Sequence, residues 1–189
     1  MLKIDMHTHI IPEHLPKWTE KFGYGDFIHL HHHKERAAMM MKGSKFFREI
    51  QSNCWDPKIR MEEYAQFGTQ VQVVSTIPVM FSYDAQPHHG LEISQFLNDH
   101  IAGICRDYPK NYIGLATIPM QDEDLAIQEL HRCKHELNLP GIQIGSNIND
   151  KNLSSERFFQ IFKACEELDM AVMIHPWNMM GFHSIERYW

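Results

Sequence analysis

The chain repeats three short apolar runs, YIGLAT (112–117), GIQIG (141–145) and MAVMIH (170–175), whose starts lie about 29 residues apart. Amphipathic helical patterns fill the gaps between them, at 124–137 and 154–168. Helices that alternate with short, almost continuously apolar strands are typical of a parallel sheet covered by helices. The second half of the chain therefore predicts an α/β fold.

The same alternation extends toward the N-terminus. Asp56 followed by Pro57 fits a helix N-cap, and Gly68 fits the end of that helix. The further elements that we expect are strands at 2–6 and 71–76 and helices at 57–67 and 90–108. Between them no period is clean, so we expect an irregular insertion of turns and short pieces after the first strand, at approximately 10–55.

Five expected strands leave two architectures open. A (β/α)₈ TIM barrel of roughly 250 residues averages about 31 residues per unit, and a doubly wound open sheet has a similar period. Neither GxGxxG nor GxxxxGK[ST] follows the first strand, which weakens the nucleotide-binding version. We therefore predict a single domain over residues 1–189, either an open sheet or the first five β/α units of a barrel.

Composition excludes several classes of protein. The 189 residues carry a net charge of −6, which argues against a nucleic-acid or anionic-membrane partner. No run approaches the roughly 18 apolar residues of a membrane helix, and the N-terminus lacks the apolar core of a secretory signal. The 4 cysteines form no CxxC pair, so reduced thiols and a cytosolic location are the simplest interpretation.

Histidine is the unusual residue, with 14 in the chain. His7 and His9 directly follow the first expected strand, and residues two apart in extended structure point to the same face. His175 ends the fifth strand, at the carboxyl edge where a parallel barrel has its active site. Three such histidines are a ligand set that zinc favours, so His7, His9 and His175 are predicted to bind one Zn²⁺ per chain.

Other polar residues carry weaker signals. The histidines between Ile28 and His33 could bind metal, but a solvated strand or loop is the simpler interpretation. Arg48 and Lys42, inside the insertion, are the best candidates for binding a carboxylate, although from spacing alone solvated surface charge explains them better. No GxSxG elbow occurs, so covalent serine or cysteine catalysis has no support.

Several longer motifs resemble one family. The chain is similar over its whole length to the 2-amino-3-carboxymuconate-6-semialdehyde decarboxylases of the amidohydrolase superfamily. The HxH pair alone would indicate only the superfamily, whereas NCWDP (53–57) and TIPVMFSY (76–83) are specific to these decarboxylases. The remaining matching motifs are KIDMHTHIIP (3–12), FGYG (22–25), PMQ (119–121), PGIQIG (140–145) and HPW (175–177).

The resemblance implies a zinc-dependent (β/α)₈ barrel that removes a carboxylate without oxidation, in the kynurenine branch of tryptophan catabolism. Such enzymes divert a dicarboxylate semialdehyde away from quinolinate and NAD synthesis, and a homodimer is implied for the complete enzyme. By position, His7, His9 and His175 match the metal ligands, Arg48 the substrate-carboxylate arginine and Lys42 an inner-pocket lysine. The fourth strand ends without a lysine, which fits members with a single metal ion.

The resemblance also implies residues that lie beyond Trp189. A further metal-binding aspartate and the acid/base histidine belong to later strands of the family's barrel, so no catalytic acid/base residue is predicted within this chain. We therefore expect an N-terminal portion that is inactive alone. Two rivals stay open: a related metal-dependent hydrolase, which product analysis would separate from a decarboxylase, and a non-catalytic truncated isoform.

Overall fold

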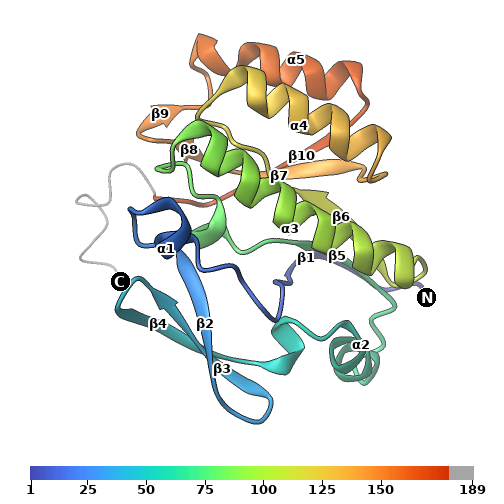
Figure 1. The fold of residues 1–189 in the computed structure, drawn as a ribbon. Helices are drawn as coiled ribbons and strands as arrows, with labels where there is room; N and C mark the ends of the chain where they lie inside the picture. Colours follow the sequence, from blue (N-terminus) through green and yellow to red (C-terminus); the bar gives the residue numbers. More distant parts are fainter. Residues whose placement is uncertain (179–189) are drawn as a thin grey trace, which may run out of the picture.

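The computed structural model describes residues 1–178, and the rest of the domain predicted over 1–189, with the terminal Tyr188-Trp189, lies outside the described residues. Five parallel strands form one curled sheet in the order β1-β5-β6-β7-β10 (Figure 1). Their bounds are β1 (Ile4–His9), β5 (Val71–Ser75), β6 (Tyr112–Ala116), β7 (Gly141–Gly145) and β10 (Ala171–His175). The predicted alternation of strands and helices is confirmed.

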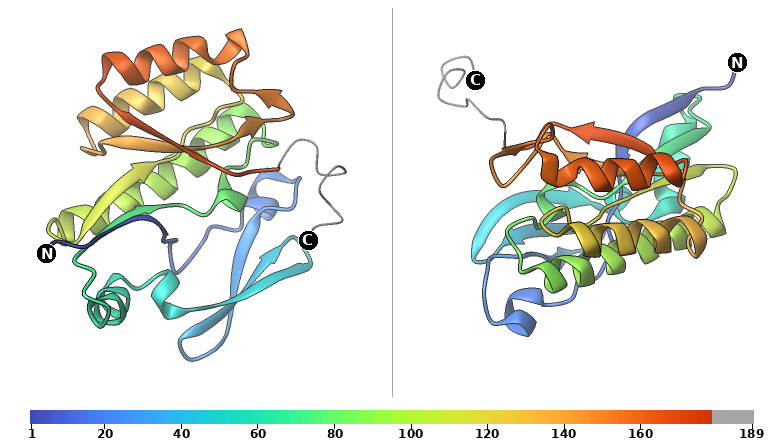
Figure 2. Two further views of the ribbon diagram at one scale, coloured as in Figure 1. Left: turned by 180° about the vertical axis from the view of Figure 1, so that it is seen from behind. Right: turned by 90° about the horizontal axis from the view of Figure 1, so that it is seen from above.

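Helices α3, α4 and α5 lie side by side against one face of this sheet (Figures 1 and 2). Asp122 caps α4 by accepting a hydrogen bond from the backbone N–H of Leu125, and Asp56 caps α2 through the N–H groups of Lys58 and Ile59. The helices are α2 (Pro57–Ala65), α3 (Pro87–Asp107), α4 (Glu123–His135) and α5 (Phe159–Glu167), the last preceded by the 3₁₀ turn η3 (Glu156–Phe158).

The main core lies between the parallel sheet and these helices. Ile142 and Ile144 of β7 are fully buried against Leu130 of α4 and Ile161 of α5. Gly114 of β6 is required by close packing, because a Cβ there would lie 2.6 Å from the side chain of Ile101. The carboxyl ends of all five strands are thereby held at one edge of a rigid scaffold.

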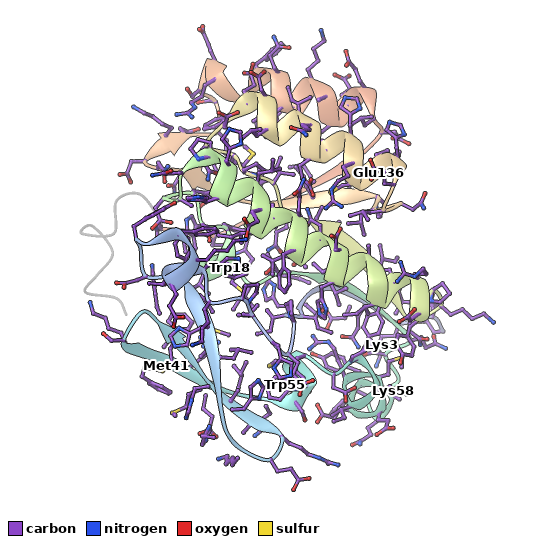
Figure 3. The ribbon with its side chains drawn as sticks, viewed as in Figure 1. Lys3, Trp18, Met41, Trp55, Lys58 and Glu136 are labelled. Atoms are coloured by element: carbon purple, nitrogen blue, oxygen red, sulfur yellow. The ribbon has the colours of Figure 1, made fainter. Side chains whose placement is uncertain are left out.

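The insertion is ordered, which corrects the prediction of an irregular segment at 10–55. It holds a short helix, one 3₁₀ turn and an antiparallel sheet in the order β2-β3-β4. A second core, which includes Trp18 and Trp55 (labelled in Figure 3), joins this sheet to the amino end of α3. The elements are α1 (Trp18–Phe22), β2 (Ile28–Lys34), β3 (Ala37–Lys42), β4 (Lys45–Gln51) and η1 (Ser52–Cys54).

The strands of the insertion were not predicted because of the residues at their outward-facing positions. Along β2, Ile28 is buried and Leu30 is half-buried, while histidines occupy the positions between and after them. Consecutive histidines, and three methionines in a row on β3, hide the period of two that indicates a strand. The expected solvated strand or loop at 28–33 is a strand.

Two boundaries also differ from the expected ones. β1 runs from Ile4 to His9 rather than over 2–6, so His7 and His9 lie within the strand and not after it. Helix α3 begins at Pro87 instead of residue 90, because Pro87 occupies its first turn although Gln86 makes no side-chain cap. The remaining short elements are η2 (Pro78–Met80) and the β8 (Asn147–Ile148)–β9 (Lys151–Asn152) hairpin. Within residues 1–178, none of the helices combines the length and apolar character needed to cross a membrane.

Candidate metal centre

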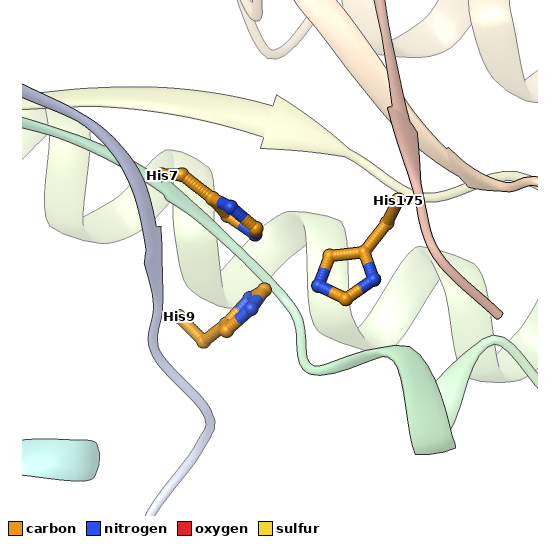
Figure 4. Close-up of side chains that lie close together, drawn as sticks. All are labelled: His7, His9 and His175. Carbon is orange, nitrogen blue, oxygen red and sulfur yellow. The ribbon is translucent and has the colours of Figure 1, made fainter. Parts of the chain in front are cut away.

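Three histidines from opposite edges of the parallel sheet face one another. His7 and His9 come from β1, and His175 ends β10, at the opposite end of the five-stranded order. Because the sheet curls, the two edge strands approach, and the three rings converge (Figure 4). The ring centroids lie 4.9 Å apart for His7–His9, 4.8 Å for His7–His175 and 5.3 Å for His9–His175. One ligand atom from each ring lies within 4.8 Å of the others.

Hydrogen bonds fix which nitrogen of His9 faces the cluster. Its Nδ1 lies 3.1 Å from the carbonyl oxygen of Thr76, which only accepts, so Nδ1 carries the proton and donates. The hydroxyl of Ser75 lies 3.2 Å from the same nitrogen and donates to Oε1 of Gln143 at 2.7 Å. The unprotonated Nε2 of His9 is therefore the ligating atom, and the residues behind it orient the ring.

His175 is held in the same manner. Its Nδ1 donates to the carbonyl oxygen of Pro176 at 2.7 Å, so Nε2 is the acceptor nitrogen of the neutral ring. Burial, followed by the proximity of His7 and His175, lowers the pKa of His9 to about 4. A neutral imidazole is the form that binds metal, so the donor set of three imidazoles fits a divalent ion such as zinc.

The histidines open onto a cavity of about 490 Å³ between the parallel sheet and the insertion. Arg48 of β4, the residue predicted to bind a carboxylate, lines this cavity. Ile50 lies two positions further along the same strand, so both side chains are on the face of β4 that lines the cavity. The apolar wall comprises Ile11, Met40, Phe47, Ile77, Pro78 and Val79. A small organic anion would find guanidinium groups and three imidazoles in this cavity.

A second arginine lines the cavity and was not singled out in the sequence. Arg60 of α2 is only 6% exposed. Its Nε donates to Oε1 of Gln72 at 2.8 Å and its Nη1 to the carbonyl oxygen of Asn53 at 2.9 Å, while its guanidinium lies over the Tyr64 ring. Arg60 therefore ties α2 to β5 and to the NCWDP segment behind the cavity.

Lys42 does not reach this cavity. It lines a separate, smaller pocket of about 70 Å³ at the end of β3, together with Asp26 and Asp84. Of the two cations predicted to bind substrate, the structure thus brings Arg48 to the histidines and leaves Lys42 apart. Asp5 accepts a hydrogen bond from the backbone N–H of His7 at 3.2 Å.

The residues that orient His9 were also missed. Ser75 and Thr76 end the expected strand at 71–76, and Gln143 lies between Ile142 and Ile144 in the fourth strand, fully buried. A polar residue in the middle of an apolar strand was the available signal. Its amide donates to the Thr76 carbonyl at 3.1 Å, so it completes the support behind His9.

Comparison with known proteins agrees with this geometry. Residues 4–187 match the protein family described as Amidohydrolase. The chain is 53% identical over 188 residues to the 2-amino-3-carboxymuconate-6-semialdehyde decarboxylase of Dictyostelium discoideum, an alignment that covers 100% of this chain and 52% of that protein. The enzyme of the same name from Caenorhabditis elegans is 29% identical over 237 residues, covering 99% of this chain and 59% of the relative. The resemblance inferred from the motifs is confirmed.

The fold is shared with solved structures. A crystal structure of 5-carboxyvanillate decarboxylase from Novosphingobium aromaticivorans, with bound manganese, superimposes with a TM-score of 0.74 at 20% identity, covering 99% of this chain and 55% of that one. The predicted TIM-barrel relationship, with five β/α units present, is thereby confirmed. The chain spans about half the length of the curated relatives that it matches.

Proposed function

Since the chain belongs to the amidohydrolase family, we propose that it forms the metal-binding and carboxylate-binding part of a non-oxidative decarboxylase. The observation that carries this proposal is the convergence of His7, His9 and His175 in a cavity that Arg48 also lines. The substrate that we propose is 2-amino-3-carboxymuconate 6-semialdehyde or a close analogue, and its support is the 53% identity to the Dictyostelium enzyme.

We assign the three histidines to one divalent ion, and we propose zinc. Three neutral imidazoles suit zinc, and a structural relative carries manganese, so a divalent ion fits the site on both grounds. When bound, the ion supplies Lewis-acid chemistry at the carboxyl ends of the strands. The hydrogen bonds of Thr76 and Ser75 to His9 hold the ligand set in place before the ion arrives.

Arg48 binds and orients the substrate in this proposal. A guanidinium forms two parallel hydrogen bonds to a carboxylate, so it fixes the plane of the bound group as well as its position. Lys42 would have to leave its pocket with Asp26 and Asp84 to contact the same substrate.

The pathway and the cellular setting follow from the same relatives. We propose that the reaction belongs to the kynurenine branch of tryptophan catabolism, where loss of the carboxylate diverts material from quinolinate and NAD synthesis. We further propose a cytosolic enzyme and a homodimer. The 4 free cysteines, all half-buried or buried, support a reducing compartment.

Binding experiments test this function without requiring turnover. The purified chain is loaded with zinc, and calorimetry follows the binding of muconate, a six-carbon dicarboxylate analogue. Arg48→Lys should weaken binding by about tenfold or more, because a point charge replaces the bidentate fork. Lys45→Ala, on the same strand but outside the cavity lining, should bind as the parent does.

Product analysis separates a decarboxylase from a hydrolase of the same family. Because the chain is expected to be inactive alone, the semialdehyde is incubated with the chain joined to the later strands of the family's barrel; this protein should release CO₂ and no product of C–N or C–O cleavage. Equal muconate binding by Arg48→Lys and the parent would remove Arg48 from the site. Hydrolytic products without CO₂ would overturn the decarboxylase assignment.

A further inference from the structure

A second group of metal-capable side chains lies on the outer face of the antiparallel insertion sheet. Along β2, Ile28 and Leu30 turn toward the insertion core, so His29 and His31 point the other way. On β3, Met40 is buried in that core and lines the metal-centre cavity, so Met39 and Met41 share the outer face. This site is separate from His7, His9 and His175.

The strand register brings the two pairs together. His29 lies directly opposite Met41, and His31 lies directly opposite Met39. Opposite Cβ atoms in an antiparallel pair are roughly 5 Å apart, and same-face neighbours along a strand are roughly 7 Å apart. The four Cβ atoms therefore mark a rectangle whose centre lies about 4 Å from each corner, within reach of an imidazole or a thioether.

All four side chains also line one cavity, with a volume of about 570 Å³. Trp18 of α1 and Met41 of β3, both labelled in Figure 3, belong to its lining. The only charged side chains in that lining, Lys17 and Glu20, pair with each other at 3.1 Å. The cavity thus presents neutral donor atoms rather than carboxylates.

The neighbouring histidines are engaged, whereas these two are free. His32 lies 2.8 Å from the Glu13 carbonyl oxygen through Nε2, and His33 lies 3.3 Å from Glu49. Among the described residues 1–178, neither His29 nor His31 has a hydrogen-bond, ion-pair or ring partner. Two imidazoles with unused nitrogen atoms therefore face two thioethers across a strand pair.

We propose that His29, His31, Met39 and Met41 form a binding site for one soft monovalent metal ion, Cu(I) or its analogue Ag(I). Thioether sulfur selects Cu(I) over harder ions, and imidazole serves copper well. Zinc gains little from thioethers and is better suited by the three imidazoles of the other centre. The chain would then hold two metal sites of different softness, one between the edge strands of the parallel sheet and one on the outer face of the insertion sheet.

Methionine-methyl NMR tests the site directly. The full chain carries Cys54→Ser and Cys105→Ser, because these two thiols are only half-buried and would compete for the probe, and excess zinc occupies the three-histidine centre. On addition of Ag(I), the ¹³C-methyl resonances of Met39 and Met41 should shift and saturate at one equivalent. Met40, on the opposite face of the same strand, and Met61 of α2 should not shift.

Affinity measurements on variants complete the test. Competition with a chromophoric Cu(I) chelator should show that Met39→Leu/Met41→Leu lowers Cu(I) affinity by at least about 100-fold. Removing a residue that only supports a ligand typically lowers metal affinity by roughly 10–100-fold, so this loss marks the methionines as ligands. His29→Gln/His31→Gln should lower Cu(I) affinity by as much, and Met61→Leu should leave it unchanged. Circular dichroism checks that each variant is folded. Unchanged Cu(I) affinity in both folded double variants, or equal Ag(I) shifts at every exposed methionine, would overturn the site.

Discussion

Zinc should stabilise this chain against heat, and His175→Ala should abolish that effect. Zinc bound by His7, His9 and His175 would join β1 to β10, which are the two edge strands of the parallel sheet. Among the described residues, no hydrogen bond of the sheet connects these two strands directly, so the ion would add a link between them. Unfolding then has to break this link.

The size of the effect follows from mass action. At a free zinc concentration of 100 times Kd, binding to the native state alone contributes about 2.7 kcal/mol. For a domain of this length, each kcal/mol moves Tm by about 2–4 °C, so zinc should raise Tm by about 5–11 °C. Removing His175 leaves two imidazoles on a single strand, and the shift should fall to about 0–2 °C.

Differential scanning calorimetry with and without zinc measures both shifts. His131→Ala is the matched control, because His131 is an exposed histidine on α4 whose ring contact within residues 1–178 is with His135. It should respond to zinc as the parent does. A Tm shift in His175→Ala as large as that of the parent would refute the assignment of zinc to this triad.

Three further outcomes test the surroundings of the site. Ser75→Ala should lower zinc affinity by about 10–100-fold, because the Ser75 hydroxyl contacts Nδ1 of His9, the ring nitrogen that faces away from the metal. Competition with a zinc chelator measures this affinity, and an unchanged value would contradict the role of Ser75. Arg60→Met should lower the free energy of unfolding in urea by about 1–3 kcal/mol, because the buried Gln72 side-chain oxygen loses its hydrogen-bond donor. An unchanged urea midpoint would count against this stabilising role of Arg60. Burial raises the pKa of the Cys105 thiol to about 11, so little of the reactive thiolate is present below that pH. The alkylation rate of Cys105 should therefore still rise about tenfold per pH unit between pH 8 and 10. A rate that levels off near pH 9 would show an ordinary thiol.

The parallel sheet could be predicted because its signals are local. YIGLAT, GIQIG and MAVMIH each became a strand within one residue of the expected bounds, since buried parallel strands are continuously apolar. The antiparallel sheet of the insertion could not be predicted in the same way. Its strands are stabilised by a core shared with Trp18, Trp55 and α3, and contacts between distant segments leave no periodic trace in the sequence.

The metal centre, too, could be predicted only where its signals are local in the sequence. His7, His9 and His175 were identified because strand ends carry a positional meaning in parallel sheets. The environment of His9 was not, because Ser75 and Gln143 come together only through the pairing of β5, β6 and β7. Arg48 and Lys42 look equivalent in the sequence, and only the fold of the insertion separates the one that faces the cavity from the one that does not.

The position of the three histidines at opposite edges of the sheet also sets when the cluster can assemble. His7 and His9 lie on β1, whereas His175 lies on β10, which must first pair with β7. Every strand between them has to be in register before the rings meet, so the cluster is a late event of folding. Metal uptake by the newly made chain should therefore lag behind the appearance of helix signal.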